Sequence, residues 1–204
     1  MLKIQYKDKG EIMNCSKYTS NTNELPKTYK YSHNINLKTH KKISILIQVI
    51  FIIIALAMVG LAIGFDFPIK SDMKTITKMI ITIGLVIVYM MLHELTHGVF
   101  MQIISKKKPN YAFRFPYLTT GSKSYFNKPS FFLIALAPVV ILGITLLIAI
   151  FFVPNNLFLS LYIVLGLNFA GSAGDYVQIY YLSKLSNDVL LQDDGQETKV
   201  FILK

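Results

Sequence analysis

The residues of this chain best suited to chemistry are two histidines and a glutamate, in the run His93-Glu94-Leu95-Thr96-His97. Residues four apart in an α-helix lie on one face, so His93 and His97 can direct two imidazoles at one metal ion. Glu94 is the next residue round the helix and can reach the open side of such an ion, where it would take a proton from water. The spacing therefore predicts a Zn2+ site with a general base.

A zinc site needs a third protein ligand, and Asp175 is the candidate. It is the first charged residue after the uncharged stretch 129–174. His97 precedes Lys106 by nine residues, and Asp175 precedes Lys184 by nine. In parallel helices both side chains would then lie about 13–14 Å from the level of the flanking lysines. We expect His93, His97 and Asp175 to share one metal ion. Sequence alone does not separate zinc from cobalt or iron at such a site.

Other uses of these polar residues stay open at this point. The histidines and Glu94 could form hydrogen bonds in a helix bundle, or line an ion path. Haem is disfavoured, because its histidines usually come from opposing helices. Asn168, seven residues before Asp175, would lie on roughly the same helix face. Its amide could donate to the oxyanion of a hydrolysed peptide or form a plain interhelical hydrogen bond. Ser172 is a candidate partner for a ligating imidazole.

The elements that carry these residues are apolar helices. The chain of 204 residues is 53% hydrophobic and 16% charged, with a mean hydropathy of +0.47, whereas soluble domains carry about 25% charged residues. A membrane helix needs about 20 apolar residues. This composition excludes large soluble enzymes, disulfide scaffolds and disordered chains. We expect an all-α membrane protein with four transmembrane helices, at about 43–65, 75–104, 130–153 and 157–182.

Lysines set the expected topology. Residues 1–42 contain nine lysines, and residues 105–129 contain five lysines and Arg114. The positive-inside rule then places both termini and this loop in the cytoplasm. The lysines that give the chain its net charge of +10 lie beside apolar segments. We therefore expect them to contact lipid head groups and not nucleic acid. The single cysteine, Cys15, excludes an intramolecular disulfide.

The expected domain organisation has three parts. Residues 1–42 form a cytoplasmic N-terminal tail, with one strand or short helix near residues 2–14. Residues 43–182 form the four-helix membrane domain, and residues 183–204 form a cytoplasmic C-terminal tail. The protein is expected to be an integral, multi-pass membrane protein.

Two local patterns refine this description. In the loop 106–128, the alternating run 111–115 predicts a strand, residues 119–122 a turn, and residues 124–126 an antiparallel return. The alternative is an aromatic loop at the level of the lipid head groups. Small residues at every fourth position (Gly166, Ala170 and Gly174) predict a close contact between helices.

A family resemblance rests on residues 93–98, 135–138 and 168–175. These segments resemble site-2-protease-type intramembrane zinc metalloproteases and, more closely, the small bacterial membrane family known as "putative zincin peptidases". The resemblance spans about residues 25–185. It implies zinc ligation by His93, His97 and Asp175, with Glu94 as general base. Asn168 would match the asparagine upstream of the ligating aspartate.

The expected function is therefore an intramembrane zinc metalloendopeptidase of a bacterial cell membrane, which hydrolyses peptide bonds of membrane-embedded proteins or peptides. Two alternatives remain: a non-catalytic binding or regulatory protein on a protease-like scaffold, and a small metal or ion transporter. Glu94 argues against the first, because a non-catalytic protein has no evident need for a buried base. The first and third spans are nearly bare of polar residues, which argues against the second. The sequence gives no substrate, cleavage site or oligomeric state.

Overall fold

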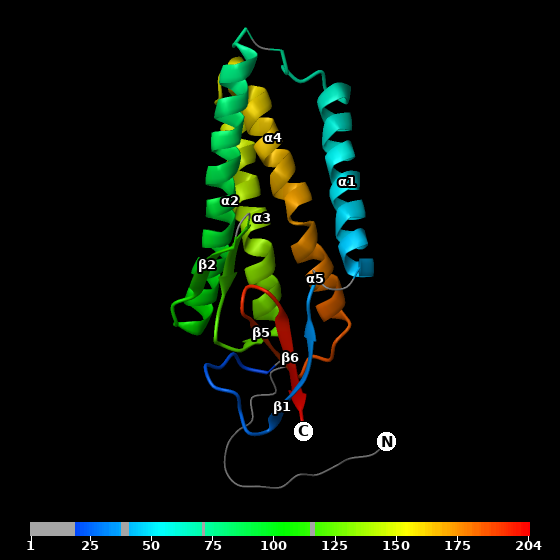
Figure 1. Cartoon of the computed structure of the whole chain (residues 1–204), viewed down its shortest axis with the longest axis vertical. Helices are drawn as coiled ribbons and strands as arrows, with labels where there is room; N and C mark the ends of the chain where they lie inside the picture. The colour runs from blue at the N-terminus through cyan, green and yellow to red at the C-terminus, as the bar shows by residue number, and fades with distance from the viewer. Residues whose placement is uncertain (1–18, 38–40, 71, 115–116) are drawn as a thin grey trace.

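The structure is a computed structural model, and it describes residues 19–37, 41–70, 72–114 and 117–204 (Figure 1). The element predicted near residues 2–14 and the cysteine Cys15 lie outside the described residues.

Four helical segments dominate the chain. They are α1 (Lys41–Gly64), α2 (Thr75–Ser105), α3 (Lys128–Ile150), and α4 (Asn155–Gly171), which α5 (Ala173–Ser183) continues beyond Ser172. Each is long and apolar enough to cross a membrane. The prediction of four helices long and apolar enough to span a membrane is confirmed, which suggests a multi-pass membrane protein, and the predicted limits differ from the observed ones by a few residues. Figure 1 shows α2, α3 and α4 side by side, with α1 standing against α4 and α5.

A four-stranded antiparallel sheet lies at one end of the bundle. It comprises β1 (Tyr29–Ile35), β4 (Phe126–Asn127), β5 (Val189–Asp193) and β6 (Thr198–Leu203), in the order β1-β6-β5-β4. The all-α expectation is therefore incomplete, because residues expected in tails form most of this sheet. Its apolar side packs against the ends of the helices in one core cluster. Those buried residues are Met101, Phe126, Phe131, Ile134, Leu182, Val189, Leu191 and Val200.

The loop between α2 and α3 contains the predicted hairpin, with a different return strand. β2 (Asn110–Arg114) pairs with β3 (Tyr117–Gly121), so that Ala112 lies opposite Thr119. Residues 119–121, predicted as a turn, belong to the strand, and the predicted return at 124–126 is wrong. The return strand begins earlier than predicted, because Arg114 already pairs with Tyr117.

Close packing against a glycine occurs at another position than predicted. A Cβ on Gly174 would meet nothing within 4 Å, and one on Gly166 would meet only Met58, at 3.9 Å. The predicted close contact along that stripe is therefore wrong. A Cβ on Gly98 would instead overlap the Tyr111 hydroxyl of β2. Gly98 thus allows the β2–β3 hairpin to lie against α2, one helical turn from Glu94.

Candidate metal centre

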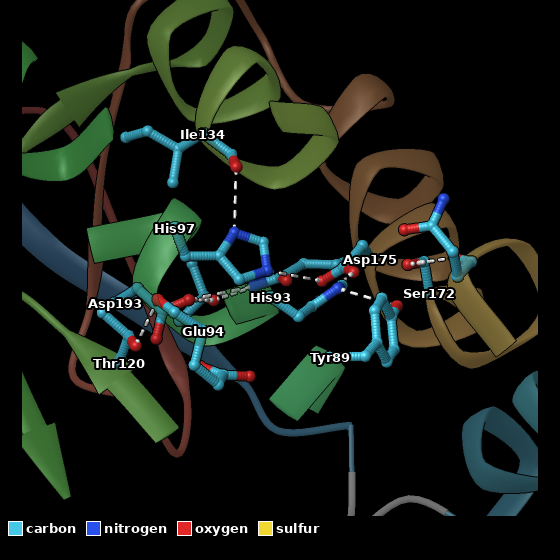
Figure 2. Close-up of polar contacts among 12 residues, drawn as sticks. Tyr89, His93, Glu94, His97, Thr120, Ile134, Ser172, Asp175 and Asp193 are labelled. Atoms are coloured by element: carbon cyan, nitrogen blue, oxygen red, sulfur yellow. Dashed lines mark hydrogen bonds and ion pairs between the residues drawn. The ribbon is translucent and has the colours of Figure 1, made fainter. Parts of the chain in front are cut away.

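The three predicted ligands come from α2 and α5 and lie close together. His93 and His97 project from one face of α2, and Asp175 lies in the first turn of α5 (Figure 2). The Nε2 atom of His93 is 3.6 Å from Oδ2 of Asp175, and the Nε2 atom of His97 is 3.8 Å from Oδ1. One ligand atom from each residue lies within 4.8 Å of the other two. The equal depth expected from the lysine positions agrees with these distances.

The spacing of these atoms suits a shared ion better than direct hydrogen bonds. Distances of 3.6 and 3.8 Å exceed the usual 2.7–3.2 Å of N–H···O bonds. Zinc ligands at about 2.0–2.1 Å in tetrahedral geometry lie roughly 3.3 Å apart. The side chains are only 12–20% exposed, which favours a defined ion-binding site. Among the described residues, this is the one group of His, Cys, Asp or Glu that could hold a metal.

Both imidazoles are oriented through their Nδ1 atoms. Nδ1 of His97 lies 2.9 Å from the Ile134 carbonyl oxygen of α3. Because a carbonyl only accepts hydrogen bonds, Nδ1 carries the proton and the Nε2 lone pair is free to bind a metal. Nδ1 of His93 lies 3.2 Å from the Tyr89 hydroxyl. The Ser172 hydroxyl donates instead to the Asn168 carbonyl oxygen at 2.9 Å (Figure 2), so its predicted contact with an imidazole is not seen among the described residues.

Two cavities flank the cluster, and Glu94 lines both. A polar cavity of about 260 Å³ includes Glu94, His97 and Asp175 in its wall. An apolar cavity of about 310 Å³ lies between α2 and α4 and is lined by the residues Val86, Tyr89, Met90, His93, Glu94, Leu118, Leu167 and Gly171. Leu118 of β3 also lines both. Glu94 thus stands between a polar and an apolar compartment.

The β2–β3 hairpin holds the backbone around Glu94. The Thr120 hydroxyl of β3 donates to the Glu94 carbonyl oxygen at 2.9 Å. Burial, and then the negative charge of Glu94, raise the pKa of the Tyr111 hydroxyl above its usual value. Tyr111 therefore stays protonated, and its hydroxyl lies against Gly98, one helical turn from Glu94.

Asp193 is a residue at the site that the sequence analysis did not single out, because it lies in the segment 183–204, which was expected to be a tail. It ends β5 and lines the polar cavity together with Gln178 of α5. Its Oδ1 accepts from the Gly195 N–H at 2.8 Å, and Oδ2 lies 3.4 Å from the Gln178 amide. Burial raises the pKa of Asp193 to about 6, against the lowering effect of these hydrogen bonds. The Asp-Asp-Gly turn was visible in the sequence, but its position beside α2 was not.

Asn168 is fully buried at the contact between α4 and α3. Its amide donates to the Val139 carbonyl oxygen at 3.0 Å, as in the interhelical alternative of the sequence analysis. Its Oδ1 has no hydrogen-bond partner among the described residues. Asn168 lines neither cavity beside Glu94. Its role as an oxyanion donor stays a prediction.

Two histidines one helical turn apart, an adjacent glutamate and an aspartate from a second helix form a group that could hold a metal ion, in a chain with four helices long and apolar enough to span a membrane. The sequence profile of the family described as "Putative zincin peptidase" matches residues 86–190, about half of the chain. The protein belongs to that family, which implies zinc and suggests metallopeptidase activity. No curated protein and no solved structure gave a match to the chain.

Proposed function

We propose that this protein is an intramembrane zinc metalloendopeptidase of the site-2-protease type, which cleaves membrane-embedded proteins or peptides. The observation that carries the proposal is the convergence of His93, His97 and Asp175 beside Glu94, within helices long and apolar enough to span a membrane. Membership of the zincin peptidase family supports hydrolysis of a peptide bond.

Each side chain has a role in this reaction. His93, His97 and Asp175 would hold the zinc ion, which when bound polarises a carbonyl group and lowers the pKa of water. Glu94 takes a proton from the attacking water and transfers it to the leaving nitrogen. The C–O bond to the scissile carbonyl carbon forms first and the C–N bond then breaks, so the products are a carboxylate and an amine.

The two cavities suit a substrate that comes from the bilayer. The apolar cavity is lined by side chains such as Met90 and Leu167, which match an apolar peptide segment. The polar cavity on the other side of Glu94 can supply water for hydrolysis. A substrate segment must be extended for attack on its backbone, and the nearby β2–β3 hairpin can pair with it through main-chain hydrogen bonds.

We also propose that both termini face the cytoplasm of a bacterial cell. The support is the lysine distribution: residues 1–42 carry nine lysines, whereas the connection 66–73 carries one. The single cysteine, Cys15, makes this testable. A membrane-impermeant maleimide should label Cys15 only after the cells are permeabilised. Labelling of intact spheroplasts would reverse the proposed orientation.

The test of the proposed activity compares wild type with Glu94→Gln after reconstitution into liposomes. The probes are single-span synthetic peptides with a fluorophore and a quencher on opposite sides of the apolar segment. We expect wild type to cleave within the apolar segment, by mass spectrometry of the products. Glu94→Gln should cleave at least roughly a thousandfold more slowly while it keeps its zinc, because only the base is lost. Equal rates for both proteins, or a zinc-loaded wild type that cleaves no peptide, would contradict the proposal.

A further inference from the structure

Helix α3 contains a proline in its interior, beside the metal centre. Pro138 lies well inside α3, which begins at Lys128, and is fully buried. Proline has no backbone N–H, so it cannot donate to the carbonyl four residues before it in a helix. That carbonyl belongs to Ile134. Pro138 therefore leaves the Ile134 oxygen without its helical hydrogen bond.

The freed carbonyl is the one that binds the ligand His97. The distance from its oxygen to Nδ1 of His97 is 2.9 Å, a normal hydrogen-bond length. Ile134 is 2% exposed, so in this setting an unpaired carbonyl would carry the cost of a buried polar group. The Ile134 carbonyl oxygen on α3 needs a donor, and the imidazole N–H of His97 on α2 needs an acceptor. The hydrogen bond between them satisfies both groups.

The hydrogen bond has a chemical consequence for the metal centre. It fixes the proton of His97 on Nδ1 and leaves the Nε2 lone pair directed toward Asp175, 3.8 Å from Oδ1. In the other tautomer, Nε2 would carry the proton and could not bind an ion. Partners of this kind typically change metal affinity by about 10–100-fold when they are removed.

We propose that Pro138 is a positioning residue of the metal centre: it keeps the Ile134 carbonyl free so that this group can orient His97 for zinc binding. The inference rests on the metal centre of the proposed function and does not depend on the peptidase reaction. Any other residue at position 138 would bring an N–H that competes with His97 for the same oxygen.

The test measures zinc affinity in Pro138→Ala, by competition with a chelator in detergent. We expect a decrease of about tenfold, because the new N–H draws the Ile134 carbonyl back into the helix. Pro138→Val is the second variant, since its side chain fills most of the space of the proline ring. It also restores the N–H, so its zinc affinity should fall to a similar extent. Thermal unfolding of the zinc-free proteins is measured in parallel.

A matched control is available in the same helix. Pro129 is exposed and lies in the first turn of α3, where a backbone N–H has no helical acceptor. Pro129→Ala should leave zinc affinity unchanged. A purely structural role for Pro138 predicts a different pattern, in which zinc affinity follows the thermal midpoint and Val restores both.

Three results would overturn the inference: unchanged zinc affinity in Pro138→Ala and Pro138→Val, an equal loss in Pro129→Ala, or zinc affinity that follows stability. Failure of the metal centre itself gives a different result. In that case the wild-type protein would bind no zinc.

Discussion

Asp193 is expected to destabilise the folded protein at neutral pH. Its pKa of about 6 in the folded chain, against an ordinary value of 3.8, comes first from burial. A raised carboxyl pKa means that the folded state holds the proton more tightly than the unfolded state. Stability therefore falls as the pH rises from about 4 to 6, and it stays lower above that range. The variant Asp193→Asn should escape this loss.

The size of the effect follows from the two pKa values. A difference of about 2 pKa units corresponds to about 3 kcal/mol at most. Each kcal/mol shifts the unfolding midpoint of a chain of this size by roughly 2–4 °C. The amide of the variant would keep an oxygen that can accept from the Gly195 N–H, as the Asp193 carboxylate does at 2.8 Å. We expect Asp193→Asn to unfold several degrees above wild type at about pH 8, and at nearly the wild-type temperature at about pH 4.

The assay is thermal unfolding in detergent between about pH 4 and 8, with a chelator present so that proton competition for zinc does not contribute. Asp194→Asn, in the same turn, is the matched control of opposite sign. Burial works to raise the pKa of Asp194, but hydrogen bonds from the Glu197 and Gln196 N–H groups and from Lys199 outweigh it and lower the pKa. Asp194→Asn should therefore lose stability relative to wild type as the pH rises. A midpoint difference for Asp193→Asn that does not change with pH would refute the reasoning.

Three further predictions concern the metal centre and its support. Gly98→Ala should destabilise the protein by about 1–3 kcal/mol in thermal unfolding, because its Cβ would overlap Tyr111. The control is Gly84→Ala, whose Cβ would meet nothing within 4 Å and which should be neutral or slightly stabilising. Equal unfolding midpoints for the two variants would contradict the close contact at Gly98. Asp175→Asn should lower zinc affinity at least roughly tenfold by chelator competition, and unchanged affinity would remove Asp175 from the ligands. Tyr89→Phe removes the hydroxyl 3.2 Å from the His93 Nδ1 and should weaken zinc binding by up to about tenfold; an effect on stability alone would argue against this role.

The membrane helices were predictable because their signal is local. The stretch 43–65 lacks charge altogether, and a bilayer imposes a fixed minimum length on any span. Helical spacing likewise placed His93 and His97 on one face. The lysine positions then put Asp175 at the same depth, which the distances to both imidazoles confirm.

The parts that escaped prediction depend on contacts between distant segments. β1 pairs with β6, which lies at the opposite end of the chain, and neither strand has a pattern that identifies its partner. The spacing of Gly166 and Gly174 predicted a helix face of small residues, but it did not predict which element packs against that face. The hydrogen bond from His97 to Ile134 depends on the relative depth of α2 and α3. Pro138 was visible in the sequence, but its consequence was not.

The most direct test of the central claim, that side chains from two membrane helices hold one metal ion, is the zinc content of the purified protein measured beside His93→Ala. We predict one zinc per wild-type chain and close to none in His93→Ala at the same protein concentration. Equal zinc in both proteins, or none in wild type after zinc is supplied, would contradict the account.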